Sequence, residues 1–427
     1  MKVGSKKIGL WTAILININI ILGAGIFINP KILTKFVGAF GFLSYIFAAL
    51  ILLPIVYSIA QLASQYPTAG GMYVYPKKFL NPFLGFISGW GYFLGKTASP
   101  ALLIHTFVSF FYYRINFLQN VSILFLDFLL IFFLIGINIF GVYIGGKVQF
   151  VFITLKTVPI LFVIIYGFIF FNPSFFSFSH FVEYNQMINS LPTAIFVLLS
   201  FEMVCSIGHM IKNPSKNINY VIFYSFLIVA IVATLFQFLM IGLFGSSLAN
   251  LSEPVSGWIN KMGFGFNFLP AILQTFIFGS IISGGFGSLA ANCWNLYKLA
   301  EDDYLPYSGV LKKINKNNVP WVSLIIEGLL ACLLLGVSIN LVSLQNMTVL
   351  GIAIAYLLNS VSTFVIKTKI AKFISFLAIA SSLYIIFLCF QNLFIFGISI
   401  SFSLIFFSGI LILVLKKILK RSPRLLS

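Results

Sequence analysis

The chain has 427 residues, of which 60% are hydrophobic and only 8% are charged. Average soluble chains carry about 25% charged residues, so this one has too little polar surface to cover a water-soluble particle. The composition therefore excludes a secreted disulfide scaffold, a disordered chain and nearly every class of soluble enzyme. Its apolar runs are long and continuous, without alternation, and they indicate an all-α polytopic membrane protein.

The formal net charge of +18 is large enough to suggest a nucleic-acid partner. The basic residues, however, form short clusters between apolar runs and make no continuous basic face, so we expect no nucleic acid to bind. The basic start resembles a signal peptide, but no small-residue cleavage site follows and the apolar run continues past Pro30, which predicts an uncleaved first span. Four single cysteines indicate neither a disulfide frame nor a metal site: Cys205, Cys293, Cys332 and Cys389.

Twelve apolar runs are long enough to span a bilayer, which takes about 20 mostly apolar residues. They predict one transmembrane domain over 1–427. The predicted spans are 10–34, 39–63, 83–112, 121–141, 147–171, 189–211, 218–244, 269–299, 320–340, 343–366, 372–391 and 393–415.

The basic residues give this topology an orientation. Twenty of them lie at the two ends and in the even-numbered loops, whereas four lie on the other side, namely Lys31, Lys35, Arg114 and Lys261. Because positive residues stay in the cytoplasm, both termini are predicted there, in a multi-pass protein of the cytoplasmic (inner) membrane. The last two, Lys96 and Lys156, fall inside spans.

Two spans contain polar and glycine-rich interruptions. Span 1 carries Asn17, Asn19 and then Gly23-Ala24-Gly25, and span 6 carries Ser200-Phe201-Glu202. Interrupted helices at matching positions of two halves are typical of a transporter's midplane binding site. Their separation by five spans predicts inverted repeats over 10–171 (spans 1–5) and 189–366 (spans 6–10), followed by spans 11 and 12 over 372–415.

Three stretches carry a resemblance to a known family: "NINIILGAGIFINP" from Asn17, "YPTAGGMYVYPKKFLNPFLGFISGWGYFLG" from Tyr66 and "SFEMVCSIGHMIKNPSKNI" from Ser200. A weaker match is "WNLYKLAEDDYLP" from Trp294. In this order they resemble the amino acid–polyamine–organocation transporters. The resemblance implies the five-plus-five inverted-repeat fold of leucine-transporter type, discontinuous spans 1 and 6, and alternating access. The amino acid and amine exchangers look nearest, because Glu202 follows the interruption of span 6.

This sequence departs from the family pattern at three positions. The family usually has glycine where this chain has Ser200, which weakens the expectation that span 6 unwinds there. Lys96 and His209 are not part of the general pattern either, and they bear on the class of substrate.

The interruptions suggest how an α-amino acid would be held. Backbone amides at the break in span 1 would form the positive end of a half-helix, suited to a carboxylate; the residues are Gly23, Ala24, Gly25 and Ile26. Carbonyls near Leu199, Ser200 and Phe201 would accept the substrate ammonium. The alternative is that the two glycines only allow span 1 to pack closely against its neighbours.

Glu202 is the acid in the middle of the site-forming span 6. A carboxylate at mid-membrane costs at least about 3 kcal/mol, so it must be protonated, paired or wetted by a cavity. We interpret it as a proton carrier or as the fixed partner of Lys96. Lys96 lies one turn from Tyr92, and its ammonium would contact either Glu202 or a substrate carboxylate.

Lys156 lies where proton-coupled relatives carry a lysine in span 5, about 13 Å along the helix from Lys147. By that resemblance its ammonium takes the place of a bound sodium ion and links span 5 to the kink of span 1 and to span 8, with Ser283 as a candidate partner. Snorkelling to the membrane surface is the alternative.

The remaining titratable groups are given modest roles. Asp127, Glu327, His105 and His180 are interpreted as structural or interfacial, whereas His209 is a candidate for lining the cytoplasmic half of span 6. Aromatic side chains are expected mainly to pack.

The sequence thus predicts a secondary active transporter of an amino acid, proton-coupled or exchanging, with a polyamine or organic-amine carrier as the alternative. Its partners would be a small-molecule substrate, protons and the lipid bilayer, in a monomer or a homodimer, with no cofactor and no metal. Enzymes, channels and ATP-driven pumps are disfavoured, because the chain has no catalytic, filter-like or Walker motif.

Overall fold

The computed structural model of the chain describes residues 9–23, 25–67, 71–141, 146–176, 183–251, 268–366, 369–393 and 398–421. It describes the backbone only for 146–150, 206–210, 268–270, 369–370, 392–393, 398–401 and 415–421. Throughout these ranges the regular structure is helical, and they contain no strand. The expected all-α class is therefore correct.

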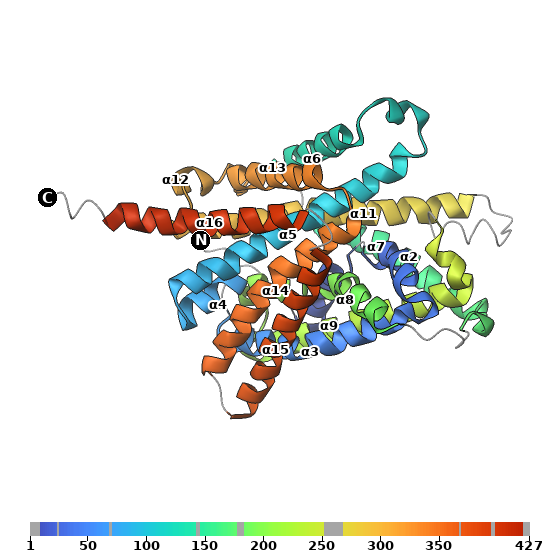
Figure 1. Cartoon of the computed structure of the whole chain (residues 1–427), viewed down its shortest axis with the longest axis horizontal. Helices are drawn as coiled ribbons and strands as arrows, with labels where there is room; N and C mark the ends of the chain where they lie inside the picture. The colour runs from blue at the N-terminus through green and yellow to red at the C-terminus, as the bar shows by residue number, and fades with distance from the viewer. Residues whose placement is uncertain are drawn as a thin grey trace. The chain divides into compact units, whose positions relative to one another are not determined.

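The α-helices follow one another along the chain (Figure 1) as α1 (Leu10–Ile21), α2 (Gly25–Val37), α3 (Gly41–Gln65), α4 (Gly71–Phe79), α5 (Pro82–Tyr112), α6 (Ile123–Ile139), α7 (Gly146–Ile169), α8 (Tyr184–Leu198), α9 (Pro214–Phe244), α11 (Phe268–Glu301), α12 (Ser308–Leu311), α13 (Trp321–Val337), α14 (Leu341–Ile366), α15 (Lys369–Leu393) and α16 (Ile398–Arg421). Short 3-10 helices are η1 (Gly38–Phe40), η2 (Asn116–Asn120), η4 (Pro173–Phe175), η5 (Phe201–Met210) and η6 (Gly245–Ala249).

Seven helical segments of the described chain are long and apolar enough to cross a membrane: Gly25–Gln65, Val151–Ile169, Tyr184–Cys205, Pro214–Ala249, Ala271–Glu301, Leu341–Ile366 and Ala371–Gln391. Shorter apolar helices are Leu10–Ile21, Ile123–Ile139, Trp321–Val337 and Phe402–Val414. In a bilayer such runs fold as helices because each backbone group must be satisfied within the segment. The chain is therefore a multi-pass membrane protein.

Helix occupies each of the twelve ranges that the sequence predicts as spans, so far as they are described. Local signals account for several boundaries. At the start of α5, for example, the Asn81 side chain accepts a hydrogen bond from the Leu84 amide and Pro82 takes the first helical position. The sequence did not predict α4, and it ended the last span at residue 415, whereas α16 continues through a lysine-rich turn to Arg421.

The chain divides into two compact units by its internal contacts. Unit 1 comprises Met1–Gly71, Gly146–Ser283 and Thr363–Leu388, and unit 2 comprises Met72–Gly145, Gly284–Ser362 and Cys389–Ser427. Unit 1 therefore holds α1, α2, α3, α7, α8, η5 and α9, together with the first half of α11 and most of α15. Unit 2 holds α4, α5, α6, α13, α16, most of α14 and the second half of α11.

Within unit 1, α9 packs along α3 and α1, while α2 and α3 both pack against α8; α3 and α9 lie side by side in Figure 1. Aromatic and branched side chains such as Tyr45, Phe226 and Phe236 fill the interior. Phe27 of α2 meets Phe236 edge to face, with ring centroids 5.9 Å apart. Because lipid is as apolar as these side chains, close packing and hydrogen bonding hold the helices together.

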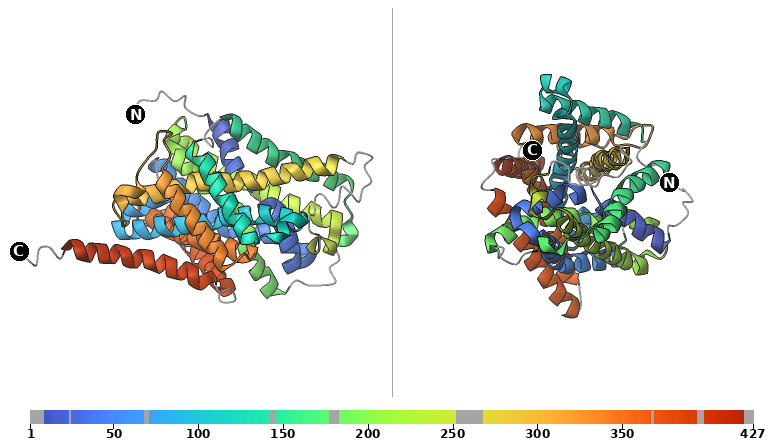
Figure 2. Two further views of the ribbon diagram at one scale, coloured as in Figure 1. Left: turned by 90° about the horizontal axis from the view of Figure 1, so that it is seen from above. Right: turned by 90° about the vertical axis from the view of Figure 1, so that its right-hand side faces the viewer.

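Within unit 2, α5 packs against α6, α13 and α16, and α6 packs against α13 (Figures 1 and 2). One close helix crossing in unit 2 is made by glycines. A Cβ atom on Gly351 of α14 would lie 2.5 Å from the carbonyl oxygen of Gly91 and 2.6 Å from Cα of Gly95 on α5. Small residues at such crossings let two backbones touch, as is common between membrane helices.

Candidate functional site

The helix of span 1 is interrupted between Ile21 and Gly25. The Leu22 amide still donates to the carbonyl of Ile18 at 2.8 Å, but the next amide, that of Gly23, turns back to the carbonyl of Ile21 at 2.6 Å. In a continuing helix the Gly23 amide would have bonded the carbonyl of Asn19. The interruption therefore deprives the Asn19 carbonyl of its helical donor.

Lys156 of α7 supplies a replacement donor. Its Nζ lies 3.1 Å from the Asn19 oxygen, and the side chain is 8% exposed. The C-terminal end of a helix carries partial negative charge, so an ammonium there is favourable. The expected link between span 5 and the kink of span 1 is thus present. Ser283, however, donates to the carbonyl of Ser280 in its own helix at 2.8 Å.

The contact of α7 with α11 lies beside Lys156 and is apolar. A Cβ atom on Gly279 of α11 would lie 2.8 Å from Cδ1 of Leu155, so the two helices approach closely at this point. Span 8 therefore meets span 5 through the residue that precedes Lys156.

The helix of span 6 is interrupted at Leu199 and Ser200. Leu199 is extended, with ψ 172°, and Ser200 has φ 79°, a left-handed conformation that glycine adopts far more easily than serine. The chain then enters η5, where the Met203 amide donates to the Ser200 carbonyl at 3.0 Å. The serine did not prevent unwinding, so the doubt raised by its presence is removed.

Side chains from span 1 connect the two interruptions. Asn17 Nδ2 donates to the Phe201 carbonyl at 3.2 Å and to Oγ of Ser225 on α9 at 2.5 Å. Beyond the break, Asn29 Nδ2 donates to the Thr193 carbonyl of α8 at 2.6 Å. The side chains of both asparagines are completely buried. The sequence drew attention to Asn17 but not to Asn29, whose position before a proline inside an apolar run was the available signal.

The expected substrate-binding residues fall in both units. Gly23, Gly25 and Ile26 lie at the break of span 1, while Ala24 lies outside the described residues. Ser200, Phe201 and Glu202 lie at the break of span 6, also in unit 1, and Glu202 is 2% exposed. Tyr92 and Lys96 are buried on α5 of unit 2, where Lys96 Nζ is 5.4 Å from the centroid of the Tyr92 ring.

Several of these groups already have structural contacts. The Phe201 ring packs edge to face on Phe226, with centroids 5.6 Å apart, so it belongs to the core of unit 1. The Ser200 carbonyl accepts from the Met203 amide, and the Phe201 carbonyl accepts from the Asn17 side chain.

Gly25 and Gly23 face different surroundings. A Cβ atom on Gly25 would lie 2.9 Å from Cγ2 of Val197 and 3.1 Å from Cε1 of Phe196, both on α8. On Gly23 it would meet nothing closer than the Ile21 carbonyl at 3.8 Å. Gly25 therefore packs closely against α8, whereas the space beside Gly23 is not filled by the described protein.

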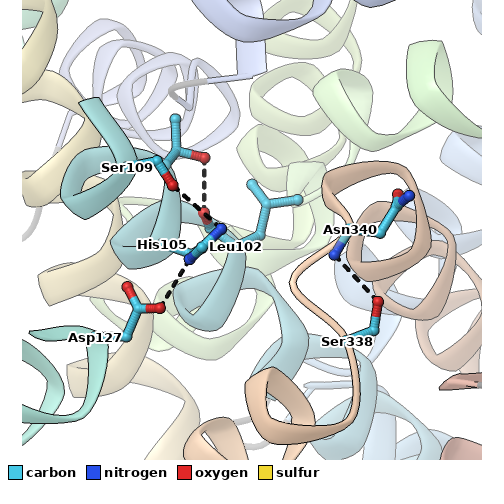
Figure 3. Close-up of polar contacts among 7 residues, drawn as sticks. Leu102, His105, Ser109, Asp127, Ser338 and Asn340 are labelled. Carbon is cyan, nitrogen blue, oxygen red and sulfur yellow. Dashed lines mark hydrogen bonds and ion pairs between the residues drawn. The ribbon is translucent and has the colours of Figure 1, made fainter. Parts of the chain in front are cut away.

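Two buried polar clusters of unit 2 contain an acid. His105 Nδ1 lies 2.8 Å from Oδ2 of Asp127, and the other ring nitrogen of His105 lies 3.1 Å from Oγ of Ser109 (Figure 3). In the second cluster, Asn292 Nδ2 donates to Oε1 of Glu327 at 3.1 Å. The side chain of His209 and the whole of His180 lie outside the described part of the chain.

A third polar cluster, at the surface of unit 2, holds α4. Asp302 accepts from the Tyr73 hydroxyl and from Lys77 Nζ, the latter at 2.7 Å, and Lys77 lies over the Tyr73 ring. Partial burial by itself would raise the pKa of Asp302, but these hydrogen bonds and the charges of Lys77 and Lys298 outweigh it and leave the pKa below its ordinary value. Asp302 is therefore a charged anchor for α4.

No three His, Cys, Asp or Glu side chains are grouped, among the described residues, in a way that would hold a metal ion. Interrupted apolar helices with buried polar side chains at the breaks instead define a membrane transporter.

The chain belongs to the amino acid permease family, which it matches over residues 8–415, and so to the amino acid–polyamine–organocation superfamily. It is 23% identical over 408 residues to the serine/threonine exchanger SteT of Bacillus subtilis (strain 168), covering 89% of this chain and 90% of that protein. It is 37% identical to an uncharacterized transporter of Mycobacterium tuberculosis (strain H37Rv) over 101 residues, 24% of this chain and 23% of that one. The chain is therefore an amino acid transporter.

Proposed function

We propose that the protein is a secondary active transporter that moves a small α-amino acid across the cytoplasmic membrane by alternating access. The observation that carries this proposal is the pair of interruptions in unit 1, connected by the Asn17 side chain. The first turn of α2 presents amides at the positive end of a helix, and no acidic side chain occupies that turn. The end of α8 presents carbonyls. A carboxylate and an ammonium on one carbon match this combination.

The proposed topology of the chain has twelve membrane spans, an inverted repeat of five plus five spans, and both termini in the cytoplasm. The division into units supports the repeat for spans 1 to 4, whose counterparts 6 to 9 fall in the same unit apart from half of span 8, whereas span 5 lies in unit 1 and most of span 10 in unit 2. Spans 1 and 2 join spans 6 and 7 in unit 1, and spans 3 and 4 join span 9 and half of span 8 in unit 2. The excess of basic residues in the ends and even-numbered loops supports the orientation.

The substrate side chain is proposed from the relative that matches along nearly the whole chain. That relative is a serine/threonine exchanger, so serine and threonine are the first candidates, with exchange as the first mode. A polyamine carrier remains the alternative. A polyamine has several ammonium groups and no carboxylate, and Glu202 is the acid that the proposed site offers.

Proton coupling is proposed for two residues of unit 1. Glu202 is buried beside the interruption of span 6 and would carry a proton. Lys156 would hold α7 against the end of α1 while its ammonium is charged, in the place of a bound sodium ion, and would loosen this contact when it loses its proton. Two cations side by side in a low-dielectric site repel by several kcal/mol, so we expect transport to be independent of sodium.

Counterflow into proteoliposomes tests the function. Vesicles loaded with unlabelled serine should take up labelled serine or threonine above the level of empty vesicles. Uptake of labelled putrescine, without uptake of any amino acid from a panel of neutral, acidic and basic ones, would replace the proposal by the polyamine alternative. Protein-free vesicles are the control for leakage. No counterflow of any amino acid or amine by protein shown to be folded would contradict both.

A further inference from the structure

Two acids, Asp127 of α6 and Glu327 of α13, are completely buried in unit 2. The sequence gives both a structural role. A charged carboxyl group among apolar membrane helices costs at least about 3 kcal/mol. Each must therefore meet a compensating charge, bind a proton or be reached by water, and the structure shows that the two acids differ in this respect.

Asp127 has a histidine as its partner. Its Oδ2 lies 2.8 Å from Nδ1 of His105, and Ser109 holds the other ring nitrogen, so that the imidazole lies between serine and carboxylate (Figure 3). A protonated imidazole can balance the charge of the carboxylate. The pair can thus be ionised without leaving a lone charge in the helix interior.

Glu327 has an amide as its partner. Its Oε1 accepts from Asn292 Nδ2, and for its Oε2 the described residues provide no hydrogen-bond partner. An amide N–H suits the neutral acid as well as the carboxylate, but it cannot cancel a full charge. The surroundings therefore fit Glu327 as a neutral acid, with a proton that can leave only when water or a base reaches Oε2.

The helices packed around Glu327 carry other titratable groups. In the described structure, no contact places a charged one of them beside the Glu327 carboxyl group. Cys293 follows Asn292 on α11, and Cys332 is on α13 itself. α16, over 402–414, and α12 carry no charged side chain. Those on α5 and α6 are Tyr92, Lys96, His105, Tyr112 and Asp127, of which Lys96 lies over the Tyr92 ring and His105 faces Asp127.

The hydrogen bonds of Asn292 couple the protonation state of Glu327 to the packing of unit 2. Its Nδ2 also lies 3.1 Å from the Phe93 carbonyl and 3.2 Å from Oγ1 of Thr97, both on α5. One amide group is therefore shared between α5 and α13. A charged carboxylate attracts an N–H donor about twice as strongly as a neutral acid, so release of the proton would draw Asn292 away from α5.

We propose that Glu327 is a further proton-binding site of this transporter, in unit 2, and that it loses and regains its proton during the transport cycle. The inference rests on the proposed transport function and adds a site to Glu202 and Lys156 of unit 1. In the step itself, the carboxyl group gives a proton to a water molecule that reaches Oε2 and becomes a carboxylate held by Asn292. The reverse step restores the neutral acid.

Infrared spectroscopy of the purified protein in lipid, without substrate, tests the site independently of transport. A protonated carboxyl group gives its own carbonyl band. We expect such a band at acidic pH that disappears reversibly as the pH is raised and is absent from Glu327→Gln. Asp127→Asn is the matched control, because it removes the other buried acid of the unit and should leave the band in place.

The transport assay then asks whether the proton is used. Glu327→Gln mimics the neutral acid, so its counterflow should lose the pH dependence of the wild type, with a change of about tenfold or more at the pH where the wild-type band has disappeared. A wild-type pH profile in a folded Glu327→Gln protein, or a band that never titrates, would overturn the proposal. If Glu327→Gln does not fold, Glu327→Asp should keep a titrating band at a shifted pH, and an unshifted band would overturn the assignment. The infrared result stands even if no amino acid is transported.

Discussion

Lys156 Nζ lies 3.1 Å from the carbonyl oxygen of Asn19, the oxygen that the interruption of α1 leaves without its helical donor. One buried ammonium therefore both compensates the broken hydrogen-bond ladder and joins α7 to the end of α1. This contact makes Lys156 a part of the interruption and not merely a neighbour of it.

We expect Lys156→Ala to reduce amino acid counterflow by about tenfold or more, because the end of α1 loses its donor and the buried charge. Lys156→Arg is the matched variant, since it keeps a positive charge and donors but not the shape of the ammonium, and it should retain more transport than alanine. Size-exclusion profiles must show that both variants are folded. Replacing sodium with choline should leave wild-type transport unchanged, and a large drop would reject this role of the lysine.

The two glycines of span 1 should respond differently to alanine. Gly25→Ala places a methyl group against Val197 and should lower stability by about 1–3 kcal/mol through overpacking. Gly23→Ala finds open space, so it should unfold at the wild-type temperature and weaken only substrate binding. Thermal unfolding in detergent, with and without substrate, separates the two effects. Unchanged binding by Gly23→Ala would remove this residue from the site.

Ser200→Gly tests the left-handed conformation at the break of span 6. A non-glycine residue at positive φ costs about 1–2 kcal/mol, and glycine costs about 0.5–1 kcal/mol of chain entropy on folding. The variant should therefore be as stable as the wild type or slightly more so. Ser200→Val, with a β-branched side chain, should be clearly less stable. A valine variant with the wild-type unfolding temperature would argue against the conformation.

Glu202→Gln keeps the size of the side chain but cannot carry a proton. We expect it to retain substrate binding and to lose one component of the pH dependence of transport. Uptake at a series of pH values, alongside binding by thermal shift, makes the comparison. If the variant gains activity with acidity as the wild type does, Glu202 is a structural residue.

The pH dependence of the α4 anchor follows from the lowered pKa of Asp302. A carboxyl group whose pKa is lower in the folded protein stabilises the fold above its unfolded pKa and loses this effect as the pH falls through the folded value. The contact of α4 should therefore hold at neutral pH and loosen only in strong acid. Hydrogen exchange of the α4 amides, corrected for intrinsic rates, measures this. Asp302→Asn should be loose already at neutral pH, whereas Tyr73→Phe, which keeps Lys77, should loosen less.

The membrane class, the helical ranges and the positions of both interruptions could be predicted because each depends on local composition: apolar length, paired glycines and polar residues inside an apolar run. The partners could not be predicted. That Asn29 bonds a carbonyl of α8, or that Gly25 packs against Val197, depends on which helix faces meet, and the sequence pattern of the helices does not specify their partners. Glu327 shows the same limit, since only its surroundings distinguish it from Asp127.

The turn at Gly38 has a consequence for how the chain crosses the bilayer. Gly25–Gln65 is 41 residues long and almost continuously helical. As a straight rod it would measure about 60 Å, twice the roughly 30 Å of the hydrocarbon layer. Gly38, at φ 58°, and η1 instead reverse the direction so that α2 and α3 contact each other. A conformation that glycine adopts readily thus folds one apolar stretch, too long for a single crossing, into two contacting helices, with Lys31 and Lys35 just before the turn.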